Sequence, residues 1–115
     1  MRSVEEVLED HLRRQLAYDL DGDVAANYAE DCIVVTSEGV FLGRAGAREA
    51  EELFHRRLPG ARYTVLAKHY RGELALLEWM AERDGILLTE GLDTFLIRDG
   101  VIRVMTTSFG ADEDE

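Results

Sequence analysis

The sequence predicts an α+β fold, in which helices from the first half of the chain pack on one face of a curved, mainly antiparallel sheet. Two observations lead to this class. Helical periodicity is confined to the first half of the chain, whereas the second half consists of long strand-like runs joined by short turns that contain glycine. These turns, which predict an antiparallel meander, are Arg71-Gly72, Asp84-Gly85 and Asp99-Gly100.

The first half of the chain contains three predicted helices. Ser3 can cap a first helix that runs to about Leu20, with acidic residues in the first turn where the helix dipole favours them. Asp23 can cap a short second helix over Val24 to Tyr28. The third helix runs from Arg44 to about Leu58, followed by Pro59-Gly60. The strands are expected at residues 32–36, 40–42, 62–70, 73–82, 86–98 and 101–109.

Length and composition predict one folded domain over residues 1–110, followed by an acidic disordered tail at residues 111–115. The formal net charge of −11, from 24 acidic and 13 basic residues, repels phosphate backbones and anionic lipids. Nucleic acid and membranes are therefore not expected as partners. Cys32 is the single cysteine, and the chain starts without the apolar core of a signal peptide, so a cytoplasmic protein is expected.

Asp93 lies in the middle of a largely apolar strand, which is unusual for a carboxylate. If Asp84-Gly85 is a two-residue turn, Glu78 pairs with Gly91 and lies diagonally next to Asp93 on the same face. Two carboxylates on one apolar face commonly raise the pKa of one of them. We therefore predict Asp93 and Glu78 as catalytic candidates, with a raised pKa for Asp93. A salt bridge to an arginine at the rim of the sheet is the alternative for Glu78.

The remaining residues of this face follow from the expected loop at residues 98–100, which places Met105 opposite Asp93 and Thr107 opposite Gly91. Gly91 can leave room for a ligand, although a β-bulge would explain it equally well. The predicted pocket face contains Leu76, Glu78, Met80, Gly91, Asp93, Phe95, Met105, Thr107 and Phe109.

The opposite face of the same strands is predicted to form a homodimer interface, because an apolar patch of that size would otherwise be exposed on a small monomer. Its residues are Leu77, Trp79, Leu88, Leu92 and Leu96. The three histidines, His11, His55 and His69, do not cluster in the predicted pattern, so neither a metal nor another cofactor is expected.

Several short motifs follow one another along nearly the whole chain. They are Gly22-Asp23, Tyr28 to Val34, Gly43-Arg44, Leu77-Glu78-Trp79, Leu92 to Phe95 and Arg98-Asp99-Gly100. In this order they resemble the SnoaL-like branch of the nuclear transport factor 2 superfamily. The resemblance implies a conical barrel with a deep pocket, paired through the outer face of its sheet. The fold carries isomerases, cyclases, dehydratases, epoxide hydrolases and plain binding proteins, so it implies no single function.

Ketosteroid isomerase, a member of this superfamily, uses an aspartate base and an oxyanion hole made of a tyrosine and a protonated aspartic acid. The resemblance places the protonated acid at Asp93, the tyrosine position at Gln15 and the base position at Thr36. Threonine cannot act as a general base near neutral pH, so steroid-type isomerisation by this mechanism is not expected. Gln15 could equally bond a backbone group. Tyr28 falls where relatives place a pocket-lining hydroxyl, or it is a core tyrosine bonded to backbone.

Two functions remain open from the sequence. One is lyase, isomerase or hydrolase chemistry on a small apolar metabolite, with Asp93 as general acid or base. The polyketide cyclases of the superfamily pair a histidine with an aspartate, but no histidine is predicted near Asp93. The other is a non-catalytic binding, accessory or dimerisation domain. A cavity of several hundred Å³ would suit a ligand, whereas closure by Phe54, Met80 and Met105 would favour the second function.

Overall fold

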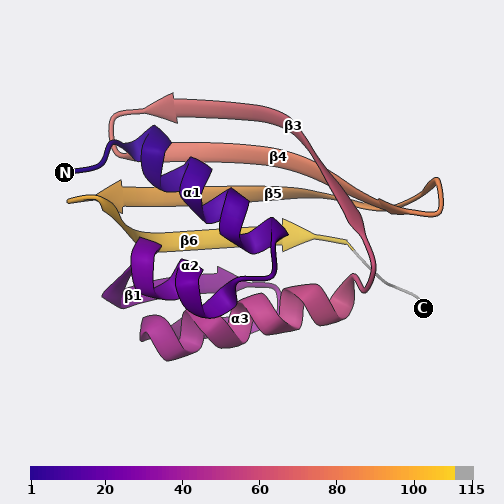
Figure 1. Cartoon of the computed structure of the whole chain (residues 1–115), viewed down its shortest axis with the longest axis horizontal. Coiled ribbons are helices and arrows are strands. Elements are labelled where there is room, and N and C mark those ends of the chain that lie inside the picture. The colour runs from indigo at the N-terminus through magenta and orange to yellow at the C-terminus, as the bar shows by residue number, and fades with distance from the viewer. Residues whose placement is uncertain (111–115) are drawn as a thin grey trace.

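The computed structural model describes residues 1–110, which form three helices on one face of a six-stranded sheet (Figure 1). The predicted acidic tail lies outside the described residues. The predicted α+β class is confirmed. The helices are α1 (Val4–Leu16), α2 (Leu20–Asn27) and α3 (Gly43–Arg57), and the strands are β1 (Tyr28–Thr36), β2 (Gly39–Leu42), β3 (Arg62–Arg71), β4 (Leu74–Arg83), β5 (Ile86–Arg98) and β6 (Val101–Phe109).

The strands lie in the order β2-β1-β6-β5-β4-β3, so β6 joins the meander to the hairpin from the first half of the chain. The pairing of β1 with β6 is parallel, and the other pairings among the described strands are antiparallel. In Figure 1, α1 crosses the meander strands while α2 and α3 lie over β1. No helix within residues 1–110 is long and apolar enough to cross a membrane.

The first helix begins where predicted but ends earlier, and the second helix begins and ends at other residues than predicted. The Ser3 cap is confirmed, because its hydroxyl accepts a bond from the Glu6 amide while the Glu6 carboxylate accepts one from the Ser3 amide. However, α1 ends at Leu16, since Tyr18 has a φ of 58° that leaves the helical region. Asp19 caps α2 instead of Asp23, and Tyr28 already belongs to β1.

Both Asp-Gly turns of the meander are two residues long. Asp84 and Gly85 have φ values of 55° and 77°, and Asp99 and Gly100 have 56° and 76°, as a type I′ turn requires. The prediction for Asp84-Gly85 is therefore confirmed. The predicted three-residue loop at residues 98–100 is wrong, because Arg98 pairs directly with Val101.

The predicted register of β4 against β5 is wrong by one residue. Next to the turn, Glu82 pairs with Leu87, but the following pair is Ala81 with Thr89. Leu88 is thus an extra residue in β5, a β-bulge that shifts every later pair. Trp79 consequently faces Gly91, where the sequence analysis placed Glu78.

A shift of one residue exchanges the two faces of a strand. Leu77 and Trp79, predicted at a dimer interface, point under the helices and are 2% and 4% exposed. Glu78 and Met80 lie on the opposite, outer face, with Glu78 exposed. The register of β5 against β6 also contains a bulge, which shifts the pairing by one residue. Together with the two-residue turn, it moves the pairs two residues from the predicted register and so keeps the predicted faces. Asp93 pairs with Thr107, and Phe95 with Met105.

The outer face of the sheet carries a row of apolar side chains that crosses five strands. Each member is the registered partner of the next, from β2 through β1, β6 and β5 to β4. We refer to this set as the outer apolar row. It consists of Leu42, Ile33, Val104, Leu96 and Leu74.

Gly91 is required by its neighbour on β4. A Cβ atom added to Gly91 would lie 2.1 Å from the Trp79 ring, so the indole lies directly on the glycine backbone. Trp79 therefore fills the space beside Gly91 that was predicted to hold a ligand. The ring also packs against Phe54, Tyr63 and Phe109, with centroid distances of 5.5, 5.9 and 5.6 Å.

Gly91→Ala should therefore displace the indole and lower the free energy of unfolding by about 1–3 kcal/mol, the usual range for overpacking. Urea unfolding followed by circular dichroism measures the change. Gly110→Ala is the matched control, because an added Cβ there would meet no atom of residues 1–108 within 4 Å. Equal stability of Gly91→Ala and wild type would contradict this account of Gly91.

Candidate functional site

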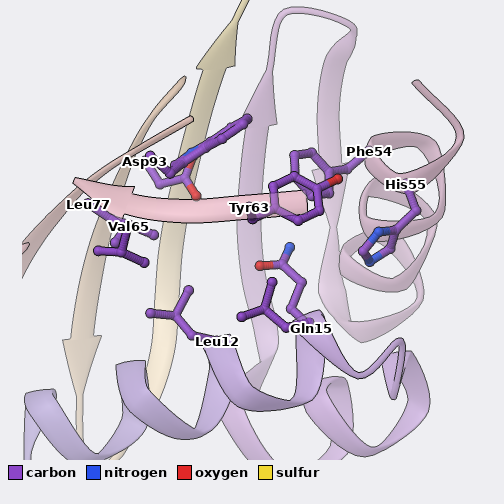
Figure 2. Close-up of a pocket in the computed structure, with 10 residues that line it drawn as sticks. Leu12, Gln15, Phe54, His55, Tyr63, Val65, Leu77 and Asp93 are labelled. Carbon is purple, nitrogen blue, oxygen red and sulfur yellow. The ribbon is translucent and has the colours of Figure 1, made fainter. Parts of the chain in front are cut away.

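The main cavity lies between α1, the end of α3 and strands β3 to β5, and its volume is about 40 Å³. Figure 2 shows Leu12 and Gln15 projecting into it from α1, with His55 at one end and Val65 and Leu77 at the other. The walls are mainly apolar. The lining residues are Leu12, Gln15, Leu16, Phe54, His55, Tyr63, Val65, Leu77, Trp79 and Asp93.

Asp93 is the buried carboxyl group of this cavity, with 5% of the residue exposed. Its Oδ1 accepts two hydrogen bonds, from Trp79 Nε1 at 3.1 Å and from Thr107 Oγ1 at 2.6 Å. The second carboxyl oxygen, Oδ2, accepts no hydrogen bond from residues 1–110. One oxygen of Asp93 is therefore fixed by the sheet, and the other remains for an additional partner.

Burial raises the pKa of Asp93, and the hydrogen bonds from Thr107 and Trp79 oppose that effect. A raised pKa for Asp93 was predicted from the sequence, but one of the two causes given for it is wrong. Glu78 was expected to add a like charge, yet it lies on the outer face of β4. Loss of solvent alone is what disfavours the charged form of this carboxyl group.

Two polar residues of the cavity were missed by the sequence analysis. His55 stands at the end of α3 and packs against Tyr18 at a centroid distance of 4.4 Å. Burial lowers the pKa of His55, and neither ring nitrogen has a hydrogen-bond partner among the described residues. The hydroxyl of Tyr63 is likewise buried without a partner there. His55 therefore lines the same cavity as Asp93, at its other end.

A second, smaller cavity of about 20 Å³ adjoins the first, since Gln15, Phe54 and Asp93 line both. It holds a further carboxyl group that the sequence analysis missed, Glu51 of α3. Burial and the nearby Asp23 carboxylate raise the pKa of Glu51. The lining residues are Gln15, Tyr28, Val34, Thr36, Ala47, Ala50, Glu51, Phe54, Asp93, Met105 and Thr107.

Most of the predicted pocket residues lie together, because seven of them line this second cavity. The hydroxyl of Tyr28 donates to Met105 Sδ at 3.6 Å, so the alternative of a backbone partner is wrong. Phe95 is buried in the core, and Phe109 lines a third cavity with Thr36 and Phe54.

The seven residues are Gln15, Tyr28, Thr36, Phe54, Asp93, Met105 and Thr107. Glu78 and Met80 are not among them, because the bulge at Leu88 turns both residues to the outer face. The site is consequently built on Asp93 without a second strand carboxylate beside it.

Behind the second cavity, α1, α2 and α3 bring three ionisable residues together. His11 Nδ1 and Asp23 Oδ2 are 2.7 Å apart, and both side chains are fully buried. Glu51 completes the group, which is the one His/Asp/Glu/Cys cluster with metal-like spacing among residues 1–110. This cluster could not be predicted from the sequence, because helix packing and not a local motif brings the three residues together.

Comparison with known proteins identifies the fold. No protein family model and no curated protein sequence matches this chain. A solved NTF-2-like protein of unknown function from Burkholderia xenovorans LB400 is 21% identical over 97% of this chain and 86% of its own length, with a TM-score of 0.74.

Two further structures carry functional names. A protein assigned to the SnoaL-like family as a candidate isomerase, from Agrobacterium tumefaciens, is 19% identical, covers 92% of this chain and 93% of its own, and has a TM-score of 0.71. IdmH, a candidate polyketide cyclase from Streptomyces antibioticus, is 16% identical, with coverages of 94% and 92% and a TM-score of 0.74. This chain therefore has the nuclear transport factor 2-like fold. The resemblance to the SnoaL-like branch is confirmed at the level of the fold.

Asp93→Asn should preserve or increase stability at neutral pH. A carboxyl group with a raised folded pKa lowers stability as the pH rises from the unfolded value of about 3.9 to the folded value, because the unfolded state loses its proton first. Asparagine removes this loss, and its amide oxygen can still accept from Trp79 and Thr107. The advantage of the variant over wild type should thus be smallest at pH 4 and grow as the pH rises towards 8.

Thermal melts of both proteins between pH 4 and 8 measure this difference. If the variant were less stable than wild type at pH 7 by more than about 1 kcal/mol, Asp93 would be an ionised structural acceptor, and the catalytic assignment below would be withdrawn.

Proposed function

We propose that this chain is a small-molecule-binding domain that catalyses proton transfer on a small, largely apolar carbonyl compound, as a lyase or an isomerase. One observation carries the proposal. The Asp93 carboxyl group, anchored through a single oxygen, shares an apolar cavity with the imidazole of His55. Burial raises the pKa of the first and lowers that of the second. A protonated acid and a neutral base on one cavity are the groups that enolisation requires.

The reaction follows from these two protonation states. A ring nitrogen of His55 takes a proton from the carbon next to the substrate carbonyl. The electron pair of the broken C–H bond moves to the carbonyl oxygen, which accepts a hydrogen bond or a proton from Asp93. Return of the proton to another carbon gives isomerisation, and loss of a leaving group gives elimination. Gln15 from α1 and the Tyr63 hydroxyl from β3, which also line this cavity, orient the substrate.

The size of the cavity sets a condition on binding. A volume of about 40 Å³ holds a few water molecules but no metabolite. Phe54 lines the main, second and third cavities, so its side chain separates them. We propose that a ligand displaces Phe54 and thereby joins these spaces into one pocket.

Trp79 is the single tryptophan of the chain and lines the main cavity, so its fluorescence reports on binding there. Cyclohexanone at increasing concentration should quench or shift this emission, and wild type should catalyse exchange of its α-protons in D₂O, followed by NMR. We expect Asp93→Asn and His55→Gln each to slow the exchange by about 10²–10⁴-fold, the usual contribution of a general acid or base. Binding should be retained.

His69→Gln is the matched control, because His69 is exposed on β3, away from the cavity lining.

A second candidate function is non-catalytic binding or an accessory role, and the small cavity volume favours it. A fluorescence response without exchange would support that candidate. Exchange that is unchanged in both Asp93→Asn and His55→Gln would overturn the proposed catalysis.

We also propose a homodimer formed through the outer face of the sheet. The interface differs from the one that the sequence analysis named, because Leu77 and Trp79 are buried under the helices. The outer apolar row takes their place, and Leu92 lies exposed on the same face of β5. A continuous apolar surface of this kind on a small domain is characteristic of a protein interface.

Ile33→Glu, the β1 member of the outer apolar row, should convert the dimer to a monomer, because it would bury a charge in the interface. Sedimentation velocity at tens of micromolar protein measures the change. Ile86→Glu is the control, since Ile86 is 66% exposed at the tip of the β4–β5 hairpin, outside the row, whereas Ile33 is 40% exposed. A wild-type protein that sediments as a monomer would contradict the proposed interface.

A further inference from the structure

We propose that His11, Asp23 and Glu51 bind one divalent transition-metal ion between the three helices. The three residues come from α1, α2 and α3 respectively, and all are buried. None of the three residues lines the main cavity, although Glu51 shares the second cavity with Asp93. The test below measures metal binding and no activity, so its failure and the failure of the proposed function are distinguishable.

The spacing of the donor atoms carries the proposal. One nitrogen of His11 and one carboxylate oxygen from each of Asp23 and Glu51 lie within 4.8 Å of one another. Metal–ligand bonds of about 2.1 Å put adjacent donors about 3 Å apart and opposite donors about 4 Å apart. The His11 Nδ1 to Asp23 Oδ2 distance of 2.7 Å is already close to the first value. Donors of a tetrahedral ion with such bonds lie roughly 3.4 Å apart, so the longest separation, at most 4.8 Å, has to shorten by up to roughly 1.4 Å.

Unused donor atoms are the second observation. Glu51 is 4% exposed, yet neither of its carboxyl oxygens makes a hydrogen bond of ordinary geometry within the described residues. Buried polar groups without partners are uncommon in folded proteins, and an unoccupied ion position is one of the recognised explanations. A cation would neutralise the two acidic side chains, Glu51 and Asp23, that lie side by side here.

The surroundings of Asp23 hold its carboxylate in place for such a role. Nδ2 of Asn27 donates to Asp23 Oδ1 at 2.8 Å, and the Asn27 amide oxygen accepts from Arg2 Nη1 at 2.8 Å. The same Asn27 nitrogen also donates to Asp10 at 2.9 Å. Groups that bond a ligating carboxylate in this manner fix its orientation and increase metal affinity.

The donor set selects the class of ion. One imidazole nitrogen with two carboxylates suits Zn²⁺, Mn²⁺, Fe²⁺ or Co²⁺, whereas Ca²⁺ requires more oxygen donors and Mg²⁺ retains several waters. An ion can reach the cluster through the second cavity, because Glu51 lines that cavity. An ion would reach the three residues from that side.

Co²⁺ is the probe of choice, because its visible d–d absorption reports on nitrogen and oxygen ligation without any assay of activity. Protein treated with EDTA and dialysed should bind one Co²⁺ per chain, and Zn²⁺ should displace it and raise the melting temperature. Glu51→Gln should weaken Co²⁺ binding at least about tenfold. Asp23→Asn is a second variant, and it should weaken binding by at least the same factor.

Glu52→Gln is the matched control, since Glu52 is the next residue of α3 but lies at the surface, paired with Arg48. It should bind Co²⁺ as wild type does. The absence of a Co²⁺ spectrum with wild type would overturn the proposal, as would Glu51→Gln binding as tightly as wild type. A melting temperature raised by Ca²⁺ as much as by Co²⁺ would contradict a site built on His11.

Discussion

The bond between Trp79 and Asp93 depends on one extra residue in β5, and the site depends on that bond. Because Leu88 bulges out, Trp79 lies opposite Gly91 and its indole N–H reaches Asp93 Oδ1. Without the bulge, Glu78 would occupy this place and the indole would be on the outer face. The same ring supports the aromatic cluster of Phe54, Tyr63 and Phe109, which forms part of the cavity walls. One inserted residue thus determines which side chains the helices cover.

Much of the fold could be predicted from the sequence, because its signals are local. The Asp84-Gly85 turn, the Ser3 cap and the order of helices and strands each follow from residues close together in the chain. The register could not be predicted in full, since a bulge leaves no local signal and changes the parity of all later pairs. Asp93 was identified as unusual in an apolar strand, whereas its partner Trp79 was assigned to the wrong face.

Three residues of the site could not be predicted from the sequence, and the reason is different from that for the register. His55, Tyr63 and Glu51 acquire their significance from burial by elements distant in the chain. Glu51 resembles an ordinary surface residue in a helix that also contains Glu49 and Glu52. Only the packing of α3 on α2 and β1 removes its side chain from water. Desolvation is also what shifts the pKa values of Asp93 and His55 in opposite directions, because it disfavours the charged form of each.

The position of β6 in the sheet has a consequence for folding. β6 follows every other described strand along the chain, yet it lies between β1 and β5 (Figure 1). The β1–β2 hairpin and the β3–β5 meander can each form from neighbouring residues, but neither pairs with the other until β6 is inserted. The parallel pairing of Tyr28 with Ile102 closes a long loop of chain, which is an entropically unfavourable step. Joining the two halves of the sheet is therefore expected to be the slow, late event of folding, with the edges of β1 and β5 exposed until then.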